Sequence, residues 1–211
     1  MPQDLRAVLR ARLAGSGVDH SRFLTVPGLA PELVEGYGVR VPTDPTPAAV
    51  LVPIVDHADG LTVLLTERAA DLRHHPGQIS FPGGRLEPGD TDPVAAALRE
   101  TEEEIGLARR HVEVIGFLPD FLLATGYRVT PVVGLVTPGF RLALDQHEVA
   151  GVFEMPLAHL LDPANHRRRE RQIGATTVEV HDIPFGARHI WGATAAMLMT
   201  LCALLTDPHD R

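Results

Sequence analysis

The chain of 211 residues contains no lysine, so all 19 of its basic side chains are arginines. Without an ammonium group it cannot have a P-loop lysine, a lysine Schiff base or a catalytic ammonium base. Serine is also scarce: it occurs only at Ser16, Ser21 and Ser80, and none of these lies in a G-x-S-x-G sequence. The composition therefore disfavours serine-hydrolase chemistry.

Cysteine, too, is nearly absent. Cys202 cannot form an intrachain disulfide, and its place in the apolar run Ala195–Leu205 predicts a buried thiol in a reducing compartment. That run is too short to cross a bilayer. Residues 1–15 contain several arginines and no apolar signal region, so we expect a cytoplasmic protein. The net charge of -8 argues against nucleic acid or an anionic membrane as partner.

The length and the pattern of apolar residues predict one α/β domain, with a mixed β-sheet covered by helices. We expect residues 1–47 to form an N-terminal helix and a wrapping segment, 48–206 the main domain and 207–211 a short tail. The predicted helices are residues 1–15, Pro93–Ile105, Pro156–Leu161 and Gly192–Thr206. The predicted strands are Ala48–Val55, Leu61–Thr66, Gln78–Phe81, Val112–Leu118, Arg128–Val136, Val149–Met155, Arg167–Ile173 and Thr177–Ile183, the first two forming an antiparallel hairpin.

The clearest helix is Pro93–Ile105, because Asp92 suits the N-cap, Pro93 the first position and Gly106 the C-terminal stop. On a helical wheel its glutamates at positions 100, 103 and 104 share one strip. Like charges at these spacings repel, and acids near a helix C-terminus oppose the helix dipole. The strip is therefore either a solvated acidic face or a site for a hard divalent cation such as Mg²⁺ or Mn²⁺.

The loop before this helix favours the cation site. Phe81-Pro82-Gly83-Gly84 supplies backbone without bulky side chains, whose carbonyls can reach a metal and whose amides can reach a phosphate. A divalent cation beside such a loop is typical of phosphoryl chemistry.

The segment from Gly84 to Leu107, GRLEPGDTDPVAAALRETEEEIGL, resembles the Nudix box, G-x5-E-x7-R-E-U-x-E-E-x-G-U, where U is a bulky apolar residue. It departs from that pattern in three ways. The spacing from Gly84 to Arg99 is one residue longer, Asp90 replaces the first glutamate, and Thr101 stands at the first apolar position. The matching positions are Gly84, Arg99, Glu100, Glu103, Glu104, Gly106 and Leu107. The resemblance implies metal binding and leaves Asp90 at most an orienting contact.

The preceding segment, LLTERAADLRHHPGQISFPGG from Leu64 to Gly84, is similar to the signature L-L-T-x-R-[SA]-x3-R-x3-G-x3-F-P-G-G of the coenzyme A diphosphatase subgroup. Every specified position agrees, and this subgroup tolerates a box longer by one residue. The similarity extends over roughly Ala48 to Leu205.

These resemblances imply the Nudix α/β/α sandwich and hydrolysis, with Mg²⁺ or Mn²⁺, of the diphosphate bond of coenzyme A and its thioesters. The products would be 3′,5′-ADP and (acyl-)4′-phosphopantetheine. By position, Glu100 and Glu104 would be the principal metal ligands, Glu103 would complete the cluster, and Arg99 would hold the carboxylates by ion pairing. Two alternatives stay open: a broader hydrolase of ADP-ribose, dinucleotides or nucleoside triphosphates, and a catalytically silent nucleotide sensor. In each case the partner is a small molecule.

The substrate contacts are expected in the signature segment, at Arg68, Arg73, Gly77, Gly83 and Gly84. The two arginines would either bind a phosphate or brace the loop through carboxylates.

Glu148 precedes a predicted strand, as the late glutamate of many Nudix enzymes does, and would be a further metal ligand, a water-activating base or a plain surface acid. The general base stays unassigned among Glu103, Glu104 and Glu148. The basic run 167–171 is expected to be a solvated edge strand or the rim of a homodimer, with contact to the 3′-phosphate as the alternative.

Overall fold

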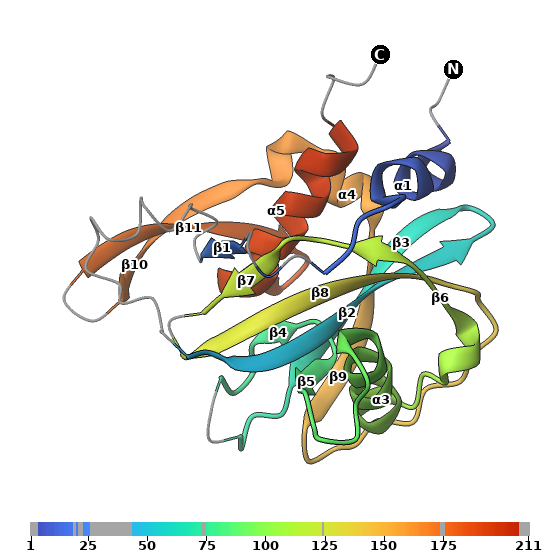
Figure 1. Cartoon of the computed structure of the whole chain (residues 1–211). Coiled ribbons are helices and arrows are strands. Elements are labelled where there is room, and N and C mark those ends of the chain that lie inside the picture. The colour runs from blue at the N-terminus through green and yellow to red at the C-terminus, as the bar shows by residue number, and fades with distance from the viewer. Residues whose placement is uncertain are drawn as a thin grey trace.

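A large mixed sheet lies between helices in the computed structural model, which describes residues 4–18, 20, 23–25, 44–72, 75–123, 125–173 and 176–206 (Figure 1). The helices are α1 (Leu5–Leu13), α3 (Pro93–Ile105), α4 (Leu157–Leu161) and α5 (Gly192–Thr206), with 3-10 turns η1 (Arg109–His111) and η2 (Pro163–Asn165). The large sheet contains β1 (Phe23–Thr25), β2 (Thr46–His57), β3 (Gly60–Arg68), β4 (Ile79–Ser80), β5 (Gly83–Arg85), β6 (Val112–Phe117), β7 (Asp120–Leu122), β8 (Tyr127–Val136) and β9 (Val149–Pro156). A second, three-stranded sheet contains β10 (Arg167–Ile173), β11 (Thr176–Phe185) and β12 (Arg188–Trp191).

Strand β2 is central to the large sheet. It runs parallel to β8 along its length, antiparallel to β3 at the hairpin, and antiparallel to the short β5 at Ala48–Val50. Strand β3 in turn pairs antiparallel with β9 and β4. The predicted hairpin is confirmed, and the sheet is mixed as expected.

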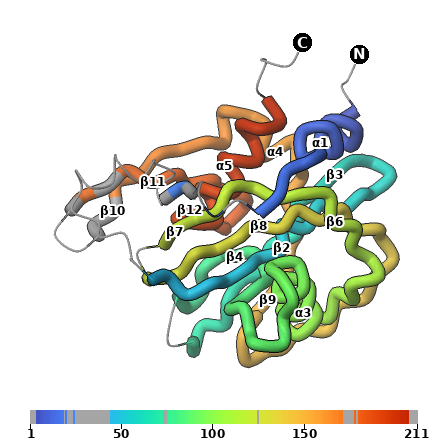
Figure 2. The backbone as a smooth tube through the Cα atoms, viewed as in Figure 1, coloured from blue at the N-terminus to red at the C-terminus, as the bar shows by residue number. Residues whose placement is uncertain are grey.

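The two faces of the sheet bury separate cores. Successive side chains of a strand point to opposite faces, so Val52 and Ile54 of β2 join the core under α1, α4 and α5, whereas Leu51 and Val55 join the core under α3. Helices thus cover both faces, which confirms the α/β/α arrangement expected from the sequence. Figure 2 shows that α1 and α5, from opposite ends of the chain, lie close together, and Leu9 and Leu13 pack with Leu201 there.

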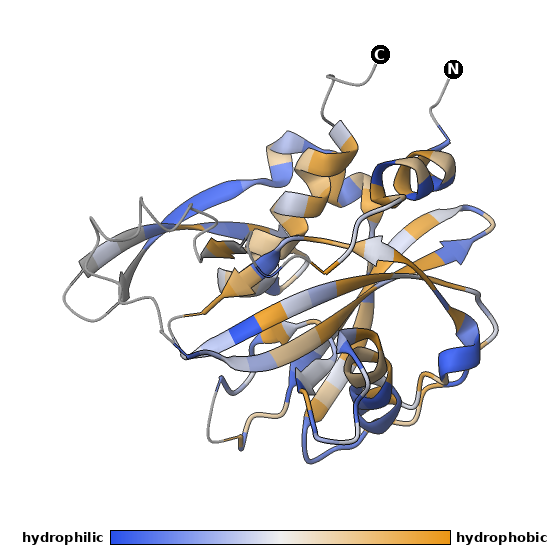
Figure 3. Cartoon of the chain, viewed as in Figure 1, coloured by the Kyte–Doolittle hydropathy of each residue, from blue (hydrophilic) through white to orange (hydrophobic). Residues whose placement is uncertain are grey.

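Hydropathy follows this layering. Helix α5 is largely apolar and buried, whereas β10 is hydrophilic (Figure 3). Cys202 of α5 is buried, which confirms that part of its prediction. None of the helices that the structure describes is long and apolar enough to span a membrane.

Four short strands were not predicted: β1, β5, β7 and β12. Each has at most four residues, too few for an alternating pattern to stand out. A second difference concerns β3, which continues to Arg68, two residues beyond the end of the predicted strand at Thr66. Residues 26–43, which include most of the expected wrapping segment, and the tail 207–211 lie outside the described residues. The domain boundaries therefore stay a prediction.

Candidate active site

Helix α3 has the bounds and caps that its sequence predicts. The Asp92 side chain accepts a hydrogen bond from the Ala95 amide at 2.8 Å, and Pro93 occupies the first turn. At the other end Gly106 adopts a φ of +71°, a left-handed conformation that suits glycine and stops the helix. Both ends are therefore determined by local chemistry.

The glutamates of the acidic strip of α3, Glu100, Glu103 and Glu104, differ in how far they are exposed to solvent. Glu103 is largely open to solvent, with 61% of its side chain exposed, whereas Glu104 is buried at 6%. The interpretation of all three glutamates as a solvated face is therefore wrong for Glu104. Thr101, the polar residue at an apolar position of the box, is buried and donates its hydroxyl hydrogen bond to the Ala97 carbonyl at 2.6 Å, so the helix itself satisfies it.

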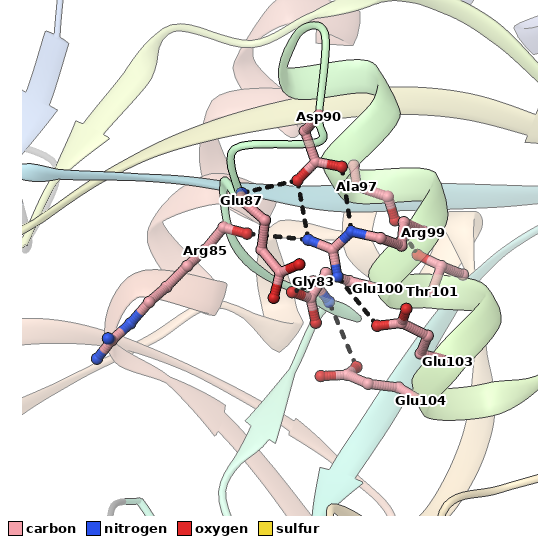
Figure 4. A network of polar contacts seen from close by, with 10 residues as sticks. All are labelled: Gly83, Arg85, Glu87, Asp90, Ala97, Arg99, Glu100, Thr101, Glu103 and Glu104. Atoms are coloured by element: carbon pink, nitrogen blue, oxygen red, sulfur yellow. Dashed lines mark hydrogen bonds and ion pairs between the residues drawn. The ribbon is translucent and has the colours of Figure 1, made fainter.

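The glycines before α3 bring backbone against these carboxylates. A Cβ atom on Gly84 would lie 2.5 Å from Cδ and Oε1 of Glu100, so only glycine permits this approach. The Gly83 amide donates a 3.3 Å hydrogen bond to Oε2 of Glu104 (Figure 4). Strand β5 thus places two expected substrate-binding glycines directly beside two expected metal ligands.

Arg99 lies at the centre of the polar network in Figure 4. Its Nη1 donates to Oε1 of Glu100 at 3.1 Å and to Oε2 of Glu103 at 3.0 Å. Its Nη2 donates to the Arg85 carbonyl at 3.1 Å, which ties α3 to β5. The structure therefore places Arg99 in ion pairs with two of the three glutamates, as the sequence predicts.

Asp90 holds the other side of the Arg99 guanidinium. Its two carboxylate oxygens accept from Nε at 3.1 Å and Nη2 at 2.9 Å, and Oδ2 also accepts from the Glu87 amide at 2.8 Å. The Arg99 hydrogen bonds are the main reason that the pKa of Asp90 is lowered. Asp90 thus makes the orienting contact expected from the sequence.

We predict that Asp90→Asn lowers kcat/KM by about ten- to a hundredfold, because partners that orient a ligand set typically contribute this much. The neutral amide cannot balance the guanidinium, so Arg99 would hold Glu100 and Glu103 less firmly. Steady-state kinetics at saturating Mn²⁺ would measure the effect. Asp59→Asn in the β2–β3 turn is the control, and equal kinetics in the two variants would contradict the assignment.

Burial and mutual repulsion raise the pKa of two carboxyl groups in the cluster. The pKa of Glu104 rises to about 8, first through burial and then through repulsion from Glu148 and Glu100, against a lowering by the Gly83 hydrogen bond. The pKa of Glu100 is also raised, mainly by burial and in part by Glu103 and Glu148, although Arg99 opposes the change. The metal-free cluster therefore favours the protonated form of Glu104 and opposes ionisation of all its carboxyl groups at once.

Glu148 joins this cluster through the backbone of its loop. The Asp145 amide donates to the Glu104 carbonyl at 2.9 Å, and the Glu148 amide donates to the Asp145 carbonyl at 3.0 Å. The Glu148 carbonyl then accepts from the Ala69 amide at 2.8 Å, next to the end of β3. Glu148 is exposed but close enough to raise the pKa of Glu104 and Glu100, so the late acid is no isolated surface group.

Arg68 reaches the same cluster from β3. Its positive charge lowers the pKa of Glu104, and its Nε is shielded from solvent with no hydrogen-bond partner among the described residues. Two alternatives were left open for Arg68: binding a phosphate, or bracing its loop by pairing with a carboxylate. Among the described residues Arg68 forms no ion pair, so the structure does not support the bracing role.

Two predicted substrate-binding residues remain. Arg73 lies outside the described residues. Gly77 forms the turn between β3 and β4, with a φ of +67° and an amide that donates to the Arg68 carbonyl.

The basic run lies on β10, at an edge of the three-stranded sheet as expected. Its charge is compensated in part, since Arg168 pairs with Glu179 at 3.1 Å and Arg169 with the buried Asp182 at 2.7 Å. Whether this edge faces a second copy of the chain stays a prediction.

The donor chemistry of the cluster suits a hard divalent cation: the side chains are partly buried carboxyl groups that repel one another when ionised, and a cation would relieve that repulsion. No three His, Cys, Asp or Glu side chains within the described ranges form a complete ligand set around one point. Arg99 instead holds Glu100 and Glu103, so we expect these carboxylates to turn toward a cation when it binds.

The NUDIX domain family matches residues 45–177, most of the chain. The chain belongs to the Nudix family. The match includes the box, the signature segment and Glu148, so the sequence resemblance to this family is confirmed. Nudix hydrolases act on phosphoric anhydrides in nucleotide-linked substrates and generally require divalent metal ions.

Relatives support this membership. The chain is 43% identical over 155 residues to a protein of Escherichia coli O7:K1 named "Uncharacterized Nudix hydrolase NudL", covering 73% of this chain and 80% of that protein. It is 41% identical over 163 residues to a protein of the same name in Shigella flexneri serotype 5b, covering 77% and 84%.

Solved structures with some likeness include a C. elegans Ap4A hydrolase complex, with 23% identity and a TM-score of 0.44, covering 53% of this chain and 80% of that one. Another is the NUDIX domain of Shewanella oneidensis NrtR with ADP ribose, with 17% identity and a TM-score of 0.42, covering 63% and 87%. Family membership depends on the domain match and the relatives, not on these likenesses.

Proposed function

We propose that this Nudix protein hydrolyses the diphosphate bond of coenzyme A and its thioesters to 3′,5′-ADP and (acyl-)4′-phosphopantetheine. The observation that carries the proposal is the complete coenzyme A diphosphatase signature from Leu64 to Gly84, whose described part leads to the acidic helix. Through β3 and β5 this segment places Arg68, Gly83 and Gly84 beside Glu100 and Glu104.

Glu100, Glu103 and Glu104 would hold Mg²⁺ or Mn²⁺. The cation, when bound, polarises a phosphoryl oxygen and neutralises charge on the leaving oxygen. Arg99 positions Glu100 and Glu103 by ion pairing, and Asp90 fixes the guanidinium plane. Because Arg99 cannot lose its proton at neutral pH, its guanidinium remains charged for these ion pairs.

Arg68 would bind a phosphoryl oxygen of the diphosphate. Its shielded Nε has a free hydrogen-bond donor, and a guanidinium presents its donors in a planar fork that matches two phosphate oxygens. With no lysine in the chain, the diphosphate would have to be held without an ammonium group, and we assign this role to arginines, backbone amides and the cation.

We assign proton removal from the attacking water to Glu148. Glu103 is ion-paired with Arg99, and Glu104 is buried and hydrogen-bonded to the Gly83 amide. Glu148 is exposed, lies close enough to Glu100 and Glu104 to raise the pKa of both, and has no ion pair among the contacts of the described residues. Water can therefore reach its carboxylate.

We predict that Glu148→Gln lowers kcat by about a hundredfold to ten-thousandfold, the usual contribution of a general base. The matched control is Glu102→Gln, which makes the same change at an acid of α3 that pairs with Arg109 at 3.7 Å. Steady-state kinetics would compare the two. If Glu148→Gln retained kcat and only weakened Mn²⁺ binding, its role would be that of a ligand.

A substrate panel tests the proposed activity directly. Coenzyme A, acetyl-coenzyme A, ADP-ribose, NADH and a nucleoside triphosphate are each incubated with Mg²⁺ or Mn²⁺, and the products are identified by mass spectrometry. We expect 3′,5′-ADP from the first two, at a kcat/KM above that of the others. Faster hydrolysis of ADP-ribose would favour the broader hydrolase, and no turnover of any compound would favour a silent sensor.

A further inference from the structure

A pocket of about 300 Å³ lies against the loop that joins β5 to α3. Pro47 at the start of β2, Leu86 after β5 and Pro93 at the start of α3 contribute apolar walls, and Arg128 and Thr130 of β8 add polar groups. This volume is at the lower end of the range of small-molecule sites, which suits part of an organic molecule better than a bare ion.

Arg128 carries a charge in this pocket that nothing in the described structure balances. Its Nε is shielded from solvent, yet it has no hydrogen-bond partner among the described residues, and none of the described ion pairs includes it. Buried donors in folded proteins are almost always paired, so an unpaired one calls for an explanation such as a ligand.

The acidic groups near the pocket are already engaged. Asp92, on the pocket wall, caps α3 by accepting from the Ala95 amide and also contacts the Thr91 hydroxyl. Asp120, 2% exposed, accepts from Thr130 Oγ1 at 2.7 Å and is hydrogen-bonded to Nδ1 of His20 at 2.6 Å. Neither carboxylate is paired with Arg128, which leaves its guanidinium open to an anion.

We propose that this pocket binds a phosphate monoester, with Arg128 as the main ligand. The guanidinium fork matches two phosphate oxygens. A phosphate monoester has a third terminal oxygen that can bond to a hydroxyl or imidazole group at the same time. Thr91 and His20 on the same pocket wall supply such groups.

The pocket and the acidic cluster share one loop. Leu86 and Asp92, at the two ends of this loop, line the pocket, whereas Asp90 within it binds Arg99 of the cluster. The phosphate has two chemical sources. It is either the 3′-phosphate of a coenzyme A substrate, an assignment that rests on the proposed function, or a separate phosphorylated molecule that stabilises the loop.

A titration with inorganic phosphate at constant ionic strength tests the site without any turnover. The Arg128 Nε–H signal is identified in ¹⁵N–¹H spectra by its loss in Arg128→Gln. In the wild-type protein we expect this signal and the amides of residues 86–92 to shift saturably, and in Arg128→Gln the apparent Kd from those amides to rise at least tenfold.

Arg110→Gln is the matched control, because Arg110 is an exposed arginine in η1, which follows the opposite end of α3. It should bind phosphate as the wild type does. Thr91→Trp, which crowds the pocket but keeps Arg128, should also weaken binding and provides a second test if Arg128→Gln does not fold. An unchanged Kd in both pocket variants, or no saturable shift in the wild type, would overturn the proposal.

Kinetics then distinguish the two sources. If the substrate supplies the phosphate, Arg128→Gln raises KM at least tenfold for coenzyme A but not for dephospho-coenzyme A, which lacks the 3′-phosphate. If a separate molecule supplies the phosphate, Arg128→Gln leaves KM unchanged for both coenzyme A and dephospho-coenzyme A. Added inorganic phosphate then changes the rate of the wild-type protein but not that of Arg128→Gln. Either pattern supports the site. A failure to hydrolyse coenzyme A would refute the proposed function and leave the titration valid.

Discussion

Glu104→Gln is expected to abolish turnover and at the same time to stabilise the metal-free protein. The variant removes a carboxylate that we assign to the cation, and the loss of one such electrostatic group lowers kcat by roughly a thousandfold. The glutamine side chain has the same shape, and its carbonyl can still accept the hydrogen bond from the Gly83 amide. The fold should therefore be retained.

The stability gain follows from the raised pKa. Glu104 has a pKa of about 8 in the folded metal-free protein and an ordinary value of 4.5. Between these values the folded state holds a proton that the unfolded state has lost, so the free energy of unfolding falls as pH rises from 4.5 to 8. At pH 7 the folded protein must therefore keep Glu104 protonated, which costs up to about 3 kcal/mol relative to the unfolded chain and which glutamine does not incur.

Thermal unfolding in the presence of a chelator measures this effect. For a chain of this length, each kcal/mol raises Tm by about 2–4 °C, so Glu104→Gln should unfold several degrees above wild type at pH 7. The difference should shrink toward pH 4.5. Glu103→Gln is the control, because that side chain is largely exposed and its variant should show little gain. A Tm for Glu104→Gln at or below the wild-type value would refute the electrostatic assignment.

Gly84→Ala should lower kcat/KM by about a hundredfold, because a displacement of about 1 Å at a reacting site has this effect. The new methyl group would lie 2.5 Å from Cδ of Glu100, closer than real contacts allow. Either Glu100 or β5 must then shift, which disturbs the expected ligand set. We also expect the affinity for Mn²⁺ to fall, measured by titration with the protein in its metal-free form.

Gly89→Ala, five residues further along the chain in the loop that joins β5 to α3, provides the control. A Cβ atom there would meet nothing within 4 Å, and its φ lies outside the left-handed region, so activity and Mn²⁺ affinity should be unchanged. Equal losses in both variants would indicate a general effect on the loop, and no loss in Gly84→Ala would show that Glu100 need not lie where the structure places it.

Much of the site was predictable because its signals are local. The caps at Asp92 and Gly106 determine where α3 begins and ends, and the helical repeat places the three glutamates on one side of it. Arg99 is one residue before Glu100 and four before Glu103, so their ion pairs also follow from the helix geometry.

Other features depend on segments that are distant in the sequence. Helical periodicity alone predicts that Glu104 is as exposed as Glu103. Glu104 is instead buried, because β5 and the loop before β9 pack against that turn of α3. Glu148 is 44 residues away along the chain, and it joins the cluster because the Asp145 amide satisfies a free carbonyl at the end of α3. No local pattern encodes either contact.

The sequence by itself determined the family and the helix that carries the acidic residues. It also determined that a chain without lysine must use arginines where it needs a permanent positive charge. Only the tertiary structure decided which charges remain unbalanced: Arg68 beside the acidic cluster and Arg128 in a separate pocket both have a shielded Nε with no partner in the described part of the chain. The physical reason is that the neighbours that pack around a charged side chain decide whether it is buried and whether it finds a partner. A strand sequence specifies which face a side chain occupies, but not which groups of other elements lie opposite it.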